Sequence, residues 1–256
     1  MTVEPHYPDL AGRVAVVTGG SRGIGAETAR AFARNGAAVA VIGRDERALA
    51  GVADAVTAAG GRALAVRADC TVDAEVASAA AKITAELGAA DILAPFAGGN
   101  GMPVPTPQET AAHWREVVES DLTSTFLSIS AFLPGMIERG HGAIVTMSSA
   151  AARQAAHSSA AYAAAKAGVI ALTRHLAAEV GPHGVRVNCI APSAIENERI
   201  RTWTTEAQRS ELAASFPLRR IGQPGDAAAA TLFLASDASS WITGVTLDVA
   251  GGKIMV

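Results

Sequence analysis

Two side chains one helical turn apart could carry out proton transfer. Tyr162 and Lys166 stand four residues apart in an alanine-rich stretch, so on a helix they share one face. An ammonium beside a phenol stabilises the phenolate, and such a group can protonate a carbonyl oxygen or deprotonate an alcohol. Ser149, thirteen residues before Tyr162, could donate a hydrogen bond to the same oxygen. The competing interpretation is an ordinary surface pair, because Tyr and Lys at this spacing are common.

A glycine-rich segment near the N-terminus predicts a nucleotide site. It reads T-G-G-S-R-G-I-G over 18–25, after the β-branched run 13–17 and before the helical pattern of 26–34. Glycines allow a tight turn and a close approach to a pyrophosphate, whose charge the positive helix end favours. A glycine-rich turn without a ligand is the alternative. The expected cofactor contacts here are Gly19, Ser21, Arg22, Gly23, Ile24 and Gly25.

Together, these motifs resemble the short-chain dehydrogenase/reductase family over roughly residue 10 to the C-terminus. Within that family, A-A-Y-A-A-A-K-A-G-V around Tyr162 and the ending G-V-T-L-D-V-A-G-G over 244–252 are most similar to the 3-oxoacyl-acyl-carrier-protein reductase branch. The resemblance implies an oxidoreductase that transfers a hydride between nicotinamide and a carbonyl or secondary alcohol. A 3-oxoacyl thioester is one candidate for the carbonyl substrate. It also implies a single-domain doubly wound Rossmann fold of the α/β class.

The alternation of short β-rich runs with longer alanine-rich stretches supports that fold class independently. It predicts a parallel sheet of about seven strands with helices on both faces. The predicted strands are Val14–Thr18, Ala38–Ile42, Ala63–Ala68, Ile92–Phe96, Gly142–Ser148, Val185–Ile190 and Val245–Val249. The predicted helices are 24–34, 46–59, 73–88, 109–138, 160–180 and 225–235.

The domain organisation is predicted from the chain length and from the even composition along the chain. The chain has 256 residues and no composition shift, which fits a tail over 1–9 and one domain over 10–256. Two stretches break the strand–helix rhythm, 98–108 and 193–218. Both follow strand ends, where open α/β sheets bind ligands, so we predict that they form the walls and lid of a substrate pocket.

Composition narrows the classes of partner. The net charge is −3 and the pI about 6.1, which argues against nucleic acid as a partner. Cys70 and Cys189 lie in apolar segments, so we expect two reduced, buried thiols and no metal site. The N-terminus lacks a signal-peptide pattern, and no apolar run is long enough to span a bilayer. We therefore expect a soluble, cytoplasmic protein that acts on a small molecule.

The end of the second predicted strand bears on the choice of cofactor. NAD-preferring enzymes of this kind carry an acidic residue where this chain has Gly43, and Arg44 follows. Arg22 in the glycine-rich turn would point at the same ribose. Two guanidinium groups without a carboxylate suit a 2′-phosphate, which predicts NADP(H) over NAD(H). Asp45 is interpreted as a solvated helix N-cap rather than a ribose contact.

The resemblance implies further contacts. Asp69 with Cys70 matches the segment that binds the adenine amino group, although Asp69 could equally cap a helix that starts near Val72. Lys166 would bond the nicotinamide ribose and Tyr162 would be the general acid/base. Ser149 is chosen over Ser148, whose side chain should face the other way. His157 lies in the loop before Tyr162, with solvent or substrate beside it. The remaining cofactor contacts are Ala97, Gly98, Pro192, Ile195 and Asn197.

The chain departs from the family pattern at several places, among them Ser193 after Pro192 and Asn197 in place of a threonine, and two departures bear on catalysis. The family's N-N-A-G becomes Pro95-Phe96-Ala97-Gly98, which loses both amides and one backbone donor. The asparagine that kinks the long fourth helix near the catalytic lysine becomes Asp121. An ionised Asp121 would stabilise the charged Lys166 and partly cancel its effect on Tyr162. The alternative function is therefore a cofactor-binding interaction protein with weakened catalysis.

Assembly can also be anticipated. Family resemblance implies that the helices over 109–138 and 160–180 pair across a two-fold axis and that C-terminal strands pair across another, giving a homotetramer. These helices carry more apolar surface than one sheet face needs: Phe126, Leu127, Ile129, Phe132, Leu172 and Leu176. An acidic carrier protein would need a basic docking patch, and only a thin one is offered by Arg139, His141, His183 and Arg186.

Overall fold

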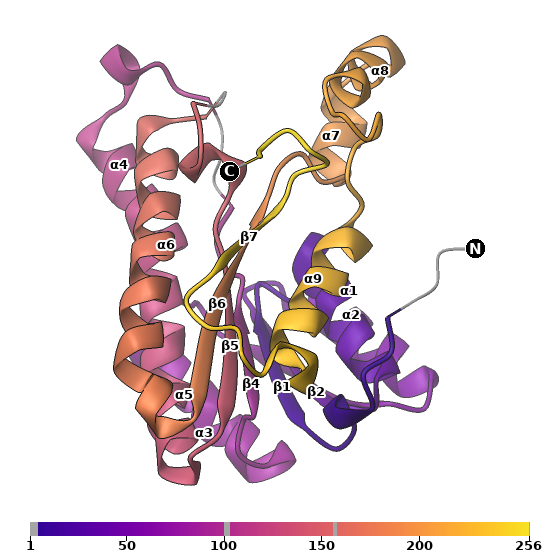
Figure 1. Ribbon diagram of the computed structural model, residues 1–256, viewed down its shortest axis with the longest axis vertical. Helices are drawn as coiled ribbons and strands as arrows, with labels where there is room; N and C mark the ends of the chain where they lie inside the picture. The colour runs from indigo at the N-terminus through magenta and orange to yellow at the C-terminus, as the bar shows by residue number, and fades with distance from the viewer. Residues whose placement is uncertain (1–4, 100–102, 156–157, 256) are drawn as a thin grey trace.

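A seven-stranded, entirely parallel sheet forms the centre of the protein, in the strand order β3-β2-β1-β4-β5-β6-β7. The computed structural model describes residues 5–99, 103–155 and 158–255 (Figure 1). His157 and part of the 98–108 loop lie outside the described residues. The strands are β1 (Val14–Thr18), β2 (Ala38–Gly43), β3 (Arg62–Arg67), β4 (Ile92–Pro95), β5 (Gly142–Met147), β6 (Val185–Pro192) and β7 (Thr246–Val249).

Helices cover both faces of this sheet, as the β-strand sequences require. The central strands are buried on both sides because alternate residues enter opposite cores. In β1, Ala15 and Val17 pack in one core, whereas Val14 and Val16 pack in the other. The first core is closed by α1 (Gly23–Arg34), α2 (Glu46–Ala58) and α9 (Pro224–Ala235). The second is closed by α3 (Asp73–Leu87), α5 (Ser124–Arg139) and α6 (Ala160–Val180).

The predicted α/β class, single domain and doubly wound parallel sheet are confirmed. Most element bounds agree within two residues, and Val14–Thr18 and the 160–180 helix agree at both ends. The main difference concerns the stretch predicted as one helix over 109–138. It begins as α4 (Ala111–Val118), loosens into a π-helical turn, η3 (Glu119–Thr123), and continues as α5. Such a π turn inserts one residue and re-aims the side chains around it.

The 193–218 stretch also contains structure that the sequence did not predict. Two short helices, α7 (Glu198–Trp203) and α8 (Glu206–Ala214), rise beyond the carboxyl ends of the strands (Figure 1). α8 buries none of its residues, so it has no apolar stripe to reveal it. Asn197 caps α7 and a Thr205–Gln208 capping box begins α8. That T-x-x-Q pattern is the signal in the sequence that could have located the second helix.

The apolar surface ascribed to the long helices is partly core. Ile129, Phe132 and Leu176 are buried against the sheet, which corrects the expectation that they add to an exposed face. Phe126 remains half-exposed. Residues 5–9 of the predicted tail lie against the domain, where the Tyr7 amide donates to the Asn35 side chain. Among the described helices, none is both long and apolar enough to cross a membrane.

Candidate active site

The first turn of α6 holds Tyr162 in place. Ser159 caps the helix, its hydroxyl accepting a hydrogen bond from the Tyr162 amide at 3.2 Å. The carboxylate of Glu109 accepts from the Ala161 amide at 3.3 Å and is almost fully buried. A negative charge at this end of a helix also complements its dipole. The backbone that carries Tyr162 is therefore held by two side chains that precede the helix, Ser159 and Glu109.

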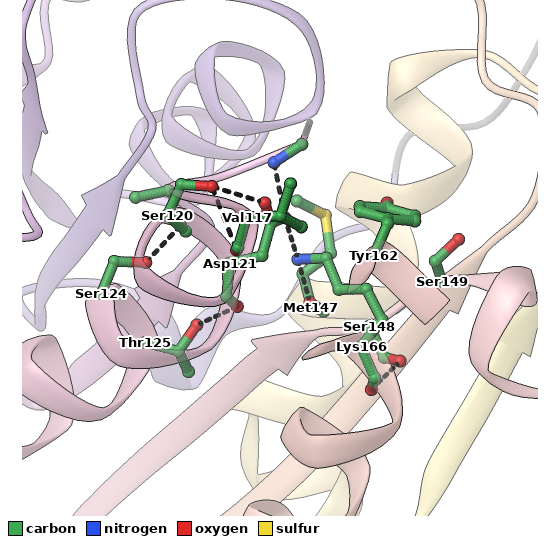
Figure 2. A network of polar contacts seen from close by, with 12 residues as sticks. Val117, Ser120, Asp121, Ser124, Thr125, Met147, Ser148, Ser149, Tyr162 and Lys166 are labelled. Carbon is green, nitrogen blue, oxygen red and sulfur yellow. Dashed lines mark hydrogen bonds and ion pairs between the residues drawn. The ribbon is translucent and has the colours of Figure 1, made fainter. Parts of the chain in front are cut away.

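Lys166 lies one turn further along α6 and is buried, with 2% of its surface exposed. Its ammonium Nζ is 5.8 Å from the centre of the Tyr162 ring. The same Nζ donates to the Met147 carbonyl oxygen at 3.1 Å and forms an ion pair with Asp121 Oδ1 at 3.1 Å (Figure 2). The predicted neighbourhood of Tyr162, Lys166 and Asp121 is thus present in the structure.

Asp121 connects three elements. Its carboxylate is fully buried in the π turn η3, where Oδ1 also accepts the Gly99 amide at 2.7 Å and Oδ2 accepts the Ser120 hydroxyl at 2.8 Å. Gly98 has a φ of +120°, and a Cβ there would lie 2.6 Å from Asp121 Oδ1. The close approach therefore requires glycine at 98. Asp121 joins the segment after β4, the π turn and α6.

The charge on Lys166 is set by two opposing effects. Burial alone would lower the pKa of Lys166, since it penalises the charged form. The Asp121 carboxylate, followed by Tyr162, outweighs burial, so the net pKa lies above the ordinary value of 10.5. Lys166 is therefore a stable cation, as the sequence led us to expect from an ionised Asp121.

The two serines after β5 face different surroundings. Ser148 is buried, and its hydroxyl donates to the Lys166 carbonyl oxygen at 2.7 Å. Ser149 is only partly buried, and its Oγ accepts the Ala151 amide at 3.2 Å while its O–H is free to donate. In Figure 2, Tyr162 lies between Lys166 and Ser149. The serine chosen from spacing is the one on the open side.

The glycine-rich turn lies at the same edge of the sheet, between β1 and α1. Gly19 has a φ of +65°, and a Cβ there would lie 2.6 Å from the Phe96 carbonyl oxygen, so the turn packs directly on the end of β4. Arg22 is the N-cap of α1 but provides no side-chain cap. The first-turn amides of this helix, from Gly23 to Gly25, are donors without a capping side chain, and they suit an anionic ligand.

Both arginines near the expected ribose have carboxylate neighbours. Arg22 pairs with Asp45 at 2.6 Å, and Arg44 lies 3.9 Å from Asp69. This corrects the expectation of two guanidinium groups with no carboxylate. Asp45 also accepts the Ala48 amide, so its interpretation as the N-cap of α2 is confirmed. The arginine side chains are 66% and 79% exposed, which leaves both able to reach a ligand.

The end of β3 presents Asp69 and Cys70. Asp69 Oδ1 accepts both the amide and the hydroxyl of Thr71, and these bonds hold the pKa of Asp69 below its ordinary value. It does not cap α3, whose N-cap is Val72, so that alternative is wrong. Burial raises the pKa of the Cys70 thiol to about 11, so this cysteine is unreactive at neutral pH.

The remaining predicted contacts also follow strand ends. The Ala97 amide donates to Thr18 Oγ1 at 3.0 Å, which joins β4 to β1. Pro192 ends β6, and Ile195 is buried behind it. The Asn197 side chain is engaged at both atoms, since Oδ1 caps α7 and Nδ2 donates to the Ile195 carbonyl oxygen. This use of Asn197 was not predicted.

The described residues give no sign of other catalytic centres. Within the described ranges, no three His, Cys, Asp or Glu side chains are arranged to hold a metal ion. A cavity of about 440 Å³ lies at the amino ends of the strands beside Arg13, His141 and Trp241. None of the predicted site residues lines it. The candidate site is the cluster at the carboxyl edge.

Comparison with known proteins agrees with this geometry. A family model described as "Enoyl-(Acyl carrier protein) reductase" matches residues 19–253, nearly the whole chain. The chain belongs to the short-chain dehydrogenase/reductase family. It is an oxidoreductase, and the resemblance to the 3-oxoacyl-acyl-carrier-protein reductase branch that its motifs suggested is confirmed.

Several dehydrogenases and reductases of this family are similar along their full length. A cis-4-hydroxycyclohexanecarboxylate dehydrogenase from Sinomonas cyclohexanicum is 42% identical over 96% of this chain and 98% of its own. A 7alpha-hydroxysteroid dehydrogenase from Escherichia coli is 37% identical over 96% and 95%. Two structures of a 3-oxoacyl-[acyl-carrier protein] reductase from Brucella melitensis are 34% identical, cover 98% and 94%, and have TM-scores of 0.91 and, with bound NAD, 0.88.

Several residues that support this candidate site were not predicted from the sequence. The Met147 carbonyl and the Gly99 amide act through the backbone, so their residue types carry no signal. Glu109 is 52 residues from Ala161 in sequence, which hides the contact between them. Glu196 stands next to two predicted cofactor contacts and is buried, but only the fold shows this.

Proposed function

We propose that this short-chain dehydrogenase/reductase is an NADP(H)-dependent carbonyl reductase or secondary-alcohol dehydrogenase. The observation that carries the proposal is the cluster of Ser149, Tyr162 and Lys166 beside the glycine-rich turn, at the carboxyl edge of the sheet. Open α/β sheets bind ligands at this edge. Asp121 is part of the same catalytic cluster through its ion pair with Lys166.

The residues present fit a nicotinamide dinucleotide. The uncapped first turn of α1 offers amide donors to a pyrophosphate, and Gly19 keeps the turn close to β4. Asp69 would face the adenine, whereas Ala97, Gly98, Pro192 and Ile195 lie where the strands end toward the nicotinamide. When bound, the cofactor accepts or donates the hydride. Everything else in the reaction falls to the protein's own side chains.

The proton is moved by Tyr162. In the reducing direction, its phenol O–H protonates the substrate oxygen, and in the oxidising direction the phenolate takes the alcohol proton. Lys166 is held as a cation by Asp121 and lies beside the ring, so it favours the phenolate. The free O–H of Ser149 donates to the same substrate oxygen and holds it in reach of Tyr162.

The relatives suggest where to look for the substrate. Two of them are named for oxidising a ring-borne hydroxyl, on cyclohexanecarboxylate and on a steroid, and two structures are of a 3-oxoacyl-carrier-protein reductase. We therefore propose a small-molecule carbonyl or secondary alcohol, with cyclic ketones and 3-oxoacyl thioesters as the first classes to assay. The lid over 193–218 and the described part of 98–108 would form the pocket walls.

Docking of an acidic carrier protein has weak support. The four residues of the thin basic patch lie at or near the amino edge of the sheet, away from Tyr162. Arg186 is committed to the end of α9, where it donates to the carbonyl oxygens of Leu234, Ala235 and Ser236. Arg139 donates to the Ala90 carbonyl. We propose a free small-molecule substrate rather than a carrier-bound one.

The alternative function, a cofactor-binding interaction protein, is less well supported. Pro95 and Asp121 were the residues that suggested weakened catalysis. Pro95 nevertheless pairs in register with Thr18 as part of β4, and Asp121 directly contacts Lys166. The departures alter the catalytic surroundings without removing any of Ser149, Tyr162 and Lys166.

Turnover measurements test the proposal. The purified protein should oxidise NADPH in the presence of at least one member of a panel of cyclic ketones, ketosteroids and 3-oxoacyl thioesters. A pure binding protein would bind NADPH without oxidising it in the presence of any ketone. NADPH fluorescence confirms that the cofactor is bound, so that a lack of turnover with every ketone would then identify a binding protein.

Removing both arginines near the ribose should change cofactor preference. The Arg22→Ala/Arg44→Ala double variant should bind NADPH about tenfold more weakly for each arginine lost, because each charge-assisted contact with the 2′-phosphate disappears. Binding of NADH should change little. Titration of both cofactors by fluorescence measures the effect, with Arg30→Ala as a control, since Arg30 lies on the same helix and faces Glu27. A wild-type protein that already prefers NADH would contradict the NADP(H) assignment.

Assembly as a homotetramer is proposed on family resemblance, with support from one surface. Trp114 on α4 and Phe126 on α5 are 42% and 50% exposed. Light scattering at micromolar protein should give four times the 25.9 kDa chain mass. A monomeric mass would count against the proposal. The cytoplasmic location expected from the sequence stays a prediction.

A further inference from the structure

Glu196 is a buried charge to which the proposed reaction assigns no role. It lies between Ile195 and Asn197, on the segment that leaves β6 toward the lid. Only 6% of its side chain is exposed. Carboxylates are almost never buried to this extent unless they are paired, because the loss of hydration is costly. Its partners therefore indicate why it is there.

Those partners come from both helices of the lid. Glu196 Oε2 forms an ion pair with Arg209 of α8 at 2.8 Å, and Oε1 with Arg201 of α7 at 3.3 Å. The two carboxylate oxygens are thus divided between two helices that follow it in the chain. One buried group holds α7 and α8 in a fixed position relative to the segment below them.

The base of the lid is tied at the same point. The Glu196 amide donates to the Gly222 carbonyl at 2.8 Å, and the Gly222 amide donates to the Ala194 carbonyl at 3.0 Å. These bonds join the start of the lid to Gly222, four residues beyond its end. Since α8 buries none of its residues, the pair with Arg209 is a principal attachment of that helix among the described residues.

We propose that Glu196 is a positioning residue that couples the lid to the cofactor-contacting segment. The proposal rests on the proposed function, in which Pro192 and Ile195 lie toward the nicotinamide. A shift of this segment on cofactor binding moves the Glu196 carboxylate, which carries α7 and α8 with it. Cofactor binding would thereby order the lid over the substrate before chemistry begins.

Hydrogen exchange at the amides of α8 tests this coupling. In the wild type, saturating NADPH should slow exchange both at residues 195–197 and in α8. In Glu196→Gln, α8 should exchange about tenfold faster than in the wild type, because charge-assisted bonds are lost. NADPH should still protect residues 195–197 in that variant but should no longer protect α8. Cofactor affinity, measured by fluorescence, confirms that the site is occupied.

Two further variants make the test specific. Arg209→Gln breaks the same contact from the lid side, where the arginine is 35% exposed, and should uncouple α8 in the same way even if Glu196→Gln folds poorly. Glu211→Gln removes an exposed carboxylate from the same helix and should leave the protection by NADPH intact.

The outcomes separate this inference from the proposed function. If NADPH protects neither 195–197 nor α8 in the wild type, the assignment of this segment to the cofactor is wrong, and the coupling with it. If NADPH protects 195–197 in the wild type but α8 exchanges equally with and without it, the coupling through Glu196 is wrong while the cofactor site stands. Equal protection of α8 in the wild type and Arg209→Gln would also overturn it.

Discussion

Replacing Tyr162 with phenylalanine should remove nearly all turnover and leave cofactor binding intact. The phenol lies beside the buried Lys166 ammonium, between it and Ser149 in Figure 2, at the carboxyl edge of the sheet. Phenylalanine fills the same space but cannot give or accept a proton. The loss in kcat should be about 10²–10⁴-fold, the range of general acid/base catalysis.

The chain offers a matched control for this variant. Its other tyrosine, Tyr7, lies near the N-terminus against Asn35, so Tyr7→Phe should keep full activity. NADPH affinity should be the same in both variants and in the wild type. Near-normal kcat in Tyr162→Phe, with a substrate that the wild type reduces, would remove Tyr162 from its proposed role and leave Ser149 and Lys166 without a proton donor.

The parts of the site that could be predicted are those fixed by local backbone. The glycine-rich turn could be predicted because Gly19 has a positive φ and approaches Phe96 closely, which only glycine allows. Strand β1 could be predicted from its unbroken apolar run, because Ala15 and Val17 enter one core while Val14 and Val16 enter the other. In both cases the chemical constraint acts within a few residues along the chain.

Contacts between distant segments were harder to predict. Arg22 and Asp45 are 23 residues apart, and their 2.6 Å ion pair depends on how β1 and β2 bring two loops together. The sequence predicted that Arg22 binds a 2′-phosphate and that Asp45 caps a helix, without a contact between the two. The structure gives Asp45 both partners, so a 2′-phosphate would compete with this carboxylate for Arg22.

Family resemblance predicted that Asp121 lies near Lys166, but not its contacts with Gly99 and Ser120. The resemblance implied a kink near Asp121 within the helix predicted over 109–138, but the sequence did not predict that the kink is a π turn, because one inserted residue changes the hydrophobic period too little. In the structure, this turn brings the carboxylate to 3.1 Å from Lys166. The carboxylate that replaces the family's asparagine is thus one partner of a buried ion pair.

Replacing Asp121 with asparagine should change both stability and the pH dependence of catalysis. The variant keeps an oxygen for the Gly99 amide but leaves the buried Lys166 ammonium without a counter-charge. Removing one partner of a buried pair typically costs about 3–5 kcal/mol in free energy of unfolding. Because the retained oxygen preserves one contact, we expect about 3 kcal/mol, measured by urea denaturation at pH 8.

The pH dependence follows from the raised pKa of Lys166. That pKa lies above 10.5 in the folded protein, so the contribution of the pair to stability is complete below that pH and is lost only above it. Without the Asp121 charge, burial dominates and the pKa of Lys166 falls. The difference in stability between the two proteins should therefore be full at neutral pH and shrink in strong alkali.

In Asp121→Asn, both limbs of the pH profile of kcat for alcohol oxidation should move. Loss of the negative charge of Asp121 favours removal of a proton from the substrate alcohol, so in Asp121→Asn the acid limb of the profile should move to lower pH. The alkaline limb should also begin earlier, because Lys166 loses its proton at lower pH. Since the two shifts act in the same direction, the whole profile of kcat moves down the pH scale.

A neighbouring carboxylate provides the control for that displacement. Glu119 lies in the same π turn but is exposed, so Glu119→Gln removes equal charge without touching Lys166, and its profile should match the wild type. Identical profiles for Asp121→Asn and the wild type, or a shift of the variant to higher pH, would show that Asp121 only preserves the shape of the turn. A downward shift in Asp121→Asn alone would show that this chain keeps its lysine charged by a direct carboxylate contact, at the expense of a less readily ionised tyrosine.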